Sequence, residues 1–133
     1  MNYPLIAAWL LSTAAFFIHS FVGDGELKIL FPEGKGEDAL RARSIWTMGR
    51  AGWHWVSVDL LCASLIAGLS LFTEMIPQQE VVLGLAGLYF FVQGLVWIMV
   101  LAISPPFAGR WLKLGQWILL WVIAAFLVWA RVW

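Results

Sequence analysis

The two histidines of the chain both stand in strongly apolar surroundings. His19 lies in the run Phe-Ile-His-Ser-Phe, and His54 lies in the run Gly-Trp-His-Trp. An imidazole ionises near neutral pH, ligates metals, and donates or accepts hydrogen bonds. Because burying such a polar group in an apolar helix is costly, it marks a candidate functional site. The pair is therefore where we look first for chemistry.

Long apolar stretches must position these histidines. Residues are 62% hydrophobic and only 12% charged. Four stretches, at roughly 3–22, 51–72, 81–103 and 111–132, each have about the 20 residues that a helix needs to cross a bilayer. Backbone polar groups in lipid must pair within their own segment, which makes each stretch an α-helix. The sequence thus predicts an all-α integral membrane protein.

Loop lengths predict how these helices are connected. A loop at about 23–50 joins the first two spans, and the later loops are short. Short connections make neighbouring helices antiparallel, so we expect a single domain, 1–133, with four transmembrane helices in an up-down bundle. The formal net charge is zero, which gives no indication of nucleic-acid binding.

Basic residues predict the orientation. Seven of the eight lysines and arginines lie in the first and third loops, at Lys28, Lys35, Arg41, Arg43, Arg50, Arg110 and Lys113. The positive-inside rule places such loops in the cytoplasm. We therefore expect an inner-membrane protein with both termini outside, in the periplasm.

Glycine and proline predict where the helices end. The sequence Gly23-Asp24-Gly25 has the composition of a turn and should end the first span. No proline interrupts the chain from Glu37 to Phe72, so this segment is expected to form one long helix. Consecutive prolines at Pro105 and Pro106 should end the third span.

Small residues predict where helices pack closely. The second span has them at Ala63, Ala67 and Ser70, and the third span at Gly84, Gly87 and Gly94. Small side chains let membrane helices approach one another. Trp97, Trp117 and Trp121 lie deep in their spans and are expected to pack or to face lipid.

The antiparallel order of the first two spans should bring His19 and His54 to a similar depth on the cytoplasmic side. Arg50 and Ser57 share the helix face of His54. Glu26 follows His19 by seven residues, about two turns of an α-helix, and would share its face if the helix continued past Gly23. These five residues are the candidate ligand- or cofactor-binding group.

Three interpretations of this group remain open. The imidazoles of His19 and His54 could ligate a haem or a metal ion, with Glu26 or Ser57 as supporting partners. Two nitrogens suffice for axial haem ligation but are few for zinc or copper. The group could instead bind a small ligand, such as a quinone or a lipid head group. In the third interpretation each histidine only holds two helices together.

Asp59 and Gln93 are the other polar residues expected inside the membrane. Asp59 follows His54 by five residues, about 140° around an α-helix, so the two should not serve one site. A hydrogen bond from Gln93 to Asp59 would join two helices. The alternative is that Asp59 is the proton-coupled acid of a small transporter.

Two motifs resemble a known pattern. His-Ser-x-x-Gly-x-x-x-Leu spans His19 to Leu27, and Trp-His-x-x-Ser spans Trp53 to Ser57. The combination resembles one found in small uncharacterised four-span bacterial membrane proteins, and it covers the first half of the chain. The resemblance implies no activity and suggests only that the two histidines belong together.

These observations favour a non-enzymatic accessory or small-ligand-binding subunit with a polar site around the histidine pair. Its partners would be the lipid bilayer and either further copies of the chain or a larger membrane complex. The alternatives are a haem- or metal-binding redox subunit that uses His19 and His54, and a proton-coupled transporter that uses Asp59.

Overall fold

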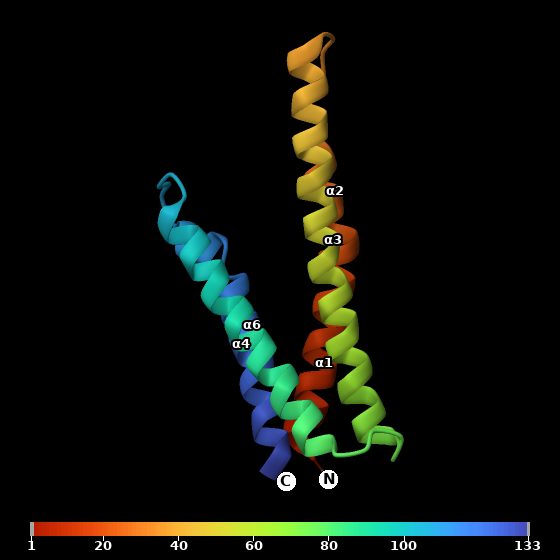
Figure 1. Cartoon of the computed structure of the whole chain (residues 1–133). Coiled ribbons are helices and arrows are strands. Elements are labelled where there is room, and N and C mark those ends of the chain that lie inside the picture. Colours follow the sequence, from red (N-terminus) through yellow and green to blue (C-terminus); the bar gives the residue numbers. More distant parts are fainter. Residues whose placement is uncertain (1, 133) are drawn as a thin grey trace. The chain divides into compact units, whose positions relative to one another are not determined.

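A computed structural model describes residues 2–132, which are almost entirely helical and contain no strand (Figure 1). The predicted all-α class is confirmed. In chain order the elements are α1 (Tyr3–Phe17), the π-helix η1 (Ile18–Gly23), α2 (Asp24–Ile29), α3 (Glu37–Phe72), α4 (Gln79–Ile103), α5 (Arg110–Lys113), α6 (Gln116–Trp129) and the short 3₁₀-helix η2 (Ala130–Val132).

Three helices are long and apolar enough to cross a membrane: Tyr3–Ile29, Glu37–Phe72 and Gln79–Ile103. A fourth apolar helix, Gln116–Val132, is shorter. The predicted fourth span, 111–132, therefore begins too early. Leu114 leaves the helical conformation, with φ −112° and ψ 47°, and this break separates α5 from α6.

The predicted turn at Gly23 is wrong. Gly23 and Asp24 both have right-handed helical backbones, so α1 continues through η1 into α2 as one helix. Most of the expected loop at 23–50 is consequently helical, and only the segment 30–36 between α2 and α3 is not. The long helix Glu37–Phe72 and the end of α4 before the two prolines are confirmed.

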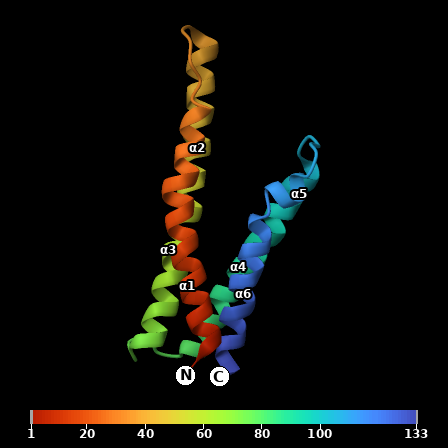
Figure 2. The same ribbon diagram turned by 180° about the vertical axis from the view of Figure 1, so that it is seen from behind.

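The chain divides into two compact units, which are described separately. One unit, Ser12–Cys62, is called here the first hairpin; in it the end of α1, η1 and α2 lie beside the N-terminal part of α3 (Figure 2). The other unit, Met1–Leu11 with Ala63–Trp133, contains α4 and α6 side by side and is called the α4–α6 unit.

Glycines let α4 and α6 approach closely, as predicted. A Cβ atom at Gly87 would lie 2.6 Å from the side chain of Val128, and one at Gly94 would collide with the indole of Trp121. Trp121 also donates a hydrogen bond to the carbonyl of Phe91 at 3.2 Å, and so acts in packing. Close approach of two backbones is how small residues stabilise membrane helix pairs.

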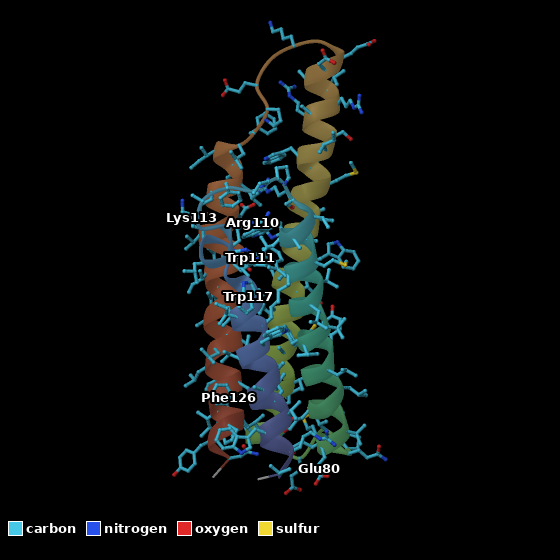
Figure 3. All side chains as sticks on the ribbon, turned by 90° about the vertical axis from the view of Figure 1, so that its left-hand side faces the viewer. Glu80, Arg110, Trp111, Lys113, Trp117 and Phe126 are labelled. Atoms are coloured by element: carbon cyan, nitrogen blue, oxygen red, sulfur yellow. The ribbon has the colours of Figure 1, made fainter. Side chains whose placement is uncertain are left out.

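The two ends of the α4–α6 pair differ in charge. Figure 3 shows Arg110, Trp111 and Lys113 at one end and Glu80 at the opposite end. The guanidinium of Arg110 lies 5.2 Å from the ring centre of Trp111 and donates to the carbonyl of Ser104. Tryptophan is typical of the membrane–water interface.

Candidate functional site

The carboxylate of Asp24 is the centre of a polar cluster in the first hairpin. Arg50 binds it with two parallel hydrogen bonds, from Nε to Oδ1 at 2.6 Å and from Nη2 to Oδ2 at 2.8 Å. Lys28 Nζ lies 3.0 Å from Oδ2, and His54 Nε2 lies 3.2 Å from Oδ1. Such two-pronged arginine–carboxylate pairs fix geometry as well as charge.

Burial is unequal within this cluster, which we call the Asp24 cluster. The Asp24 side chain is 10% exposed, whereas Arg50 is 34% and His54 44% exposed. The carboxylate is therefore covered by the groups that bind it. The three side chains around it are cationic or can be protonated, so hydrogen-bond donors surround the negative charge of Asp24.

Local helix geometry explains why Asp24 points toward α3. Residues Ile18–Gly23 form a π-helix, in which hydrogen bonds run from residue i to i+5. Asp24 follows His19 by five residues, so the wider turn brings both onto the same side. On α2, Lys28 follows Asp24 by four residues, the spacing that joins opposite charges on a helix.

His19 has its own partners one turn away. Its Nδ1 lies 3.0 Å from Ser57 Oγ, and its ring stacks on the indole of Trp53 with centres 4.0 Å apart. The Trp53 indole N–H donates to the carbonyl of His19 at 2.9 Å. The same indole lies directly against Gly23, where a Cβ atom would collide with it. His19, Gly23, Trp53 and Ser57 thus form one tightly packed contact.

Further donors on α3 reach backbone carbonyls across the hairpin. Trp46 Nε1 donates to Leu27 O at 3.1 Å, and Arg43 Nη2 donates to Gly34 O at 2.9 Å. The guanidinium of Arg50 also lies 5.4 Å from the ring centre of Trp46. These contacts satisfy carbonyls at the end of α2 and in the segment 30–36, which an apolar partner could not do.

Four of the five predicted site residues lie in the contact between the two helices of the first hairpin. They are His19, Arg50, His54 and Ser57. The fifth, Glu26, is exposed, and Asp24 takes the acidic position expected for it. The prediction for Glu26 assumed regular α-helical spacing after His19. The π-helix shifts that register, which is why Asp24 faces α3 instead.

Sequence reasoning missed Asp24, Lys28 and Trp53. Asp24 stands between two glycines, a context that indicates a turn rather than a helix. The signal that was present is the i,i+4 spacing of Asp24 and Lys28, which indicates a helix through the predicted turn. The stacking of Trp53 on His19 depends on the other helix, so the residues around Trp53 in the sequence do not indicate it.

The metal interpretation finds no support in residues 2–132. They contain no group of three or more histidine, cysteine, aspartate or glutamate side chains that could hold a metal ion. The two imidazoles also have separate partners, Ser57 and Trp53 for His19 and Asp24 for His54. Each imidazole therefore contacts a residue of the opposing helix.

Asp59 and Gln93 belong to different units, Asp59 to the first hairpin and Gln93 to the α4–α6 unit. Their predicted hydrogen bond therefore stays a prediction, as does the role of Asp59 as a proton-coupled acid. Asp59 is half-buried on α3.

A hollow of about 400 Å³ lies on α3 beside the Asp24 cluster. It is lined by Ala51, His54, Trp55 and Val58, and the indole of Trp55 is 73% exposed. His54 therefore stands between the Asp24 carboxylate and this hollow. When its Nε2–H donates to Asp24, the neutral ring keeps a lone pair on Nδ1 for another partner.

Fold and site together define an all-helical protein with three helices long and apolar enough to cross a membrane, whose first hairpin is closed by an ion-pair cluster. Comparison with known proteins adds nothing to this class, since no protein-family model, no curated protein and no solved structure matches the chain.

Proposed function

We propose that the chain crosses the bacterial inner membrane four times, as an antiparallel bundle with both termini in the periplasm. Three long apolar helices and the shorter apolar helix Gln116–Val132 support four crossings. Lys35 between α2 and α3, the basic residues of the adjoining helix ends, and Arg110 with Lys113 support a cytoplasmic position for these two regions.

Fusions of reporter enzymes test the orientation. Alkaline phosphatase, which is active only outside the cytoplasm, should be active when fused after Val132 and inactive when fused after Gly34. A fluorescent protein that matures in the cytoplasm should give the opposite pattern at the same two positions. Phosphatase activity at both positions would contradict four crossings, and activity only at Gly34 would contradict the orientation.

Within this topology, we propose that the protein is a non-enzymatic accessory subunit that binds a small membrane-soluble ligand at His54. The observation on which this depends is the position of His54, hydrogen-bonded to the Asp24 carboxylate on one side and lining the hollow on the other. A carboxylate that orients an imidazole fixes which ring nitrogen is available to a ligand.

The lining of the hollow favours a quinone. A quinone head is planar and largely apolar, and it offers carbonyl oxygens, or hydroxyl groups when reduced. Trp55 provides an exposed aromatic face, Ala51 and Val58 provide apolar walls, and His54 provides the hydrogen bond. Such a subunit would present its ligand to further copies of the chain or to a larger membrane complex.

Binding of a soluble quinone analogue tests this function. Purified protein in mild detergent should bind decylubiquinone saturably, at one molecule per chain. Trp55→Ala should weaken binding about tenfold, because an aromatic stacking contact is worth up to about 1.5 kcal/mol. Trp55 makes no contribution to the Asp24 cluster, so this variant should unfold at the wild-type temperature.

Met48→Ala is the matched control, since Met48 is an equally exposed apolar residue of α3 outside the hollow. It should bind like the wild type. His54→Gln should lose quinone binding, because it removes the imidazole that provides the hydrogen bond. Absence of saturable binding, or equal binding by the Trp55 and Met48 variants, would contradict the proposed function.

A further inference from the structure

An apolar groove of about 720 Å³ runs along the α4–α6 pair. On α4 it extends from Val81 to Phe91, about 15 Å at the rise of an α-helix. Its sides include Leu85, Leu88 and Val128, which are exposed. Gly84 and Gly87 line the groove without a side chain to fill it.

One end of the groove is polar. Arg131 lines the groove and also lines an adjoining hollow of about 570 Å³, together with Val81. Glu80, Gln78 and Gln79 line the same hollow. The Arg131 guanidinium lies over Gly84, where a Cβ atom would be only 2.8 Å from Nη1. The glycine thus leaves the space in which this cation sits at the mouth of the groove.

Together, the apolar groove and the adjoining polar hollow match a molecule with an apolar chain and a polar head. The apolar groove ends at a hollow whose lining includes one cation, one carboxylate and three amide side chains, those of Asn2, Gln78 and Gln79. The polar end coincides with the start of α4, so it lies where the membrane helix meets the interface.

We propose that this groove binds one phospholipid with a zwitterionic, primary-amine head group, of the phosphatidylethanolamine type. An acyl chain would lie along the groove, the phosphate would bind Arg131, and the ammonium group would bind Glu80. Arginine binds phosphate oxygens through paired donors, and a primary ammonium donates hydrogen bonds to a carboxylate.

Charge complementarity distinguishes this lipid from others in the same bilayer. A phosphatidylglycerol head would satisfy Arg131, but its terminal glycerol is uncharged and offers Glu80 no cation to pair with. A phosphatidylcholine head has no N–H group to donate to Glu80. The pairing of Arg131 with Glu80 in one hollow therefore favours the ethanolamine head over both.

Native mass spectrometry of the full-length protein tests the proposal, with synthetic phosphatidylethanolamine, phosphatidylglycerol and phosphatidylcholine of identical acyl chains as probes. The wild type should retain one phosphatidylethanolamine in preference to the other two. Arg131→Gln should reduce its retention about tenfold, as expected for loss of a charged hydrogen bond. Glu80→Gln should weaken the retention of phosphatidylethanolamine to the level of phosphatidylcholine.

The acyl channel is tested separately by Ala125→Trp, because Ala125 is an exposed residue that lines the groove. A tryptophan there should fill the channel and prevent lipid retention. Val122→Trp places the same side chain at an exposed position of α6 outside the groove and should have no effect. Retention that is equal for the three lipids, or unaffected by Ala125→Trp, would overturn the proposal. So would a homodimer that Ala125→Trp dissociates, since a second copy would then occupy the groove.

Discussion

Gly23→Ala is expected to destabilise the first hairpin by about 1–3 kcal/mol, the usual cost of forcing extra atoms into a packed contact. The added Cβ would collide with the indole of Trp53. That ring cannot move aside freely, because its N–H is bonded to His19 O and its face stacks on the His19 ring. The measurement is the apparent melting temperature in mild detergent, followed by tryptophan fluorescence.

Gly25→Ala is the matched control for this prediction. Gly25 lies in α2, two residues further on, and a Cβ atom there would meet nothing within 4 Å. Alanine also favours helix over glycine by about 1 kcal/mol, so Gly25→Ala should leave stability unchanged or raise it. If both variants melt at the same temperature, the close contact of Gly23 with Trp53 is not what limits the hairpin.

A double-mutant cycle identifies the partner in this collision. In a Trp53→Ala background the indole is absent, so adding a methyl group at Gly23 should cost nothing further. An undiminished cost in that background would show that Gly23→Ala acts through the π-helix itself and not through Trp53.

Asp24→Asn is expected to give the largest loss of stability among the polar residues of the hairpin. Asparagine keeps the size of the side chain but removes the charge that Arg50, Lys28 and His54 share. Removing one partner of a covered ion pair is costly because the other is left uncompensated. The melting temperature should fall more for Asp24→Asn than for Arg50→Gln, and least for Lys28→Gln, whose side chain is 63% exposed.

Two further variants separate the cluster from general charge effects. Arg50→Gln combined with Asp24→Asn should recover part of the stability lost with Asp24→Asn alone, because the unpaired cation is then also removed. Glu33→Gln changes an exposed carboxylate in the segment 30–36 and should have no measurable effect. Additive losses in the double variant would contradict an ion pair between Asp24 and Arg50.

Segment length and helix-breaking residues predicted most of the secondary structure. Helix α3 follows from the absence of proline between Glu37 and Phe72, and α4 ends just before Pro105 and Pro106. The glycines of α4 predicted a close-packed face, and Gly87 and Gly94 do contact α6. These features depend on neighbours in sequence or on a property of single residues, so pattern alone reveals them.

The candidate site was predicted in part. Helical spacing placed Arg50, His54 and Ser57 on one face of α3, and all three contact the preceding helix. Spacing failed for Glu26, because regular α-helical periodicity does not hold through the π-helix at Ile18–Gly23. One altered turn was enough to exchange Glu26 for Asp24.

Local sequence therefore determined that this protein is helical, where α3 and α4 end, and which face of α3 is polar. Only the tertiary structure decided that Gly23-Asp24-Gly25 is helical and that Asp24 is the centre of the cluster. The physical reason is that neither residue is stabilised by its neighbours in sequence alone. The indole of Trp53 leaves no room for a side chain at Gly23. Asp24 is stabilised by Arg50 and His54, which also lie on the opposing helix.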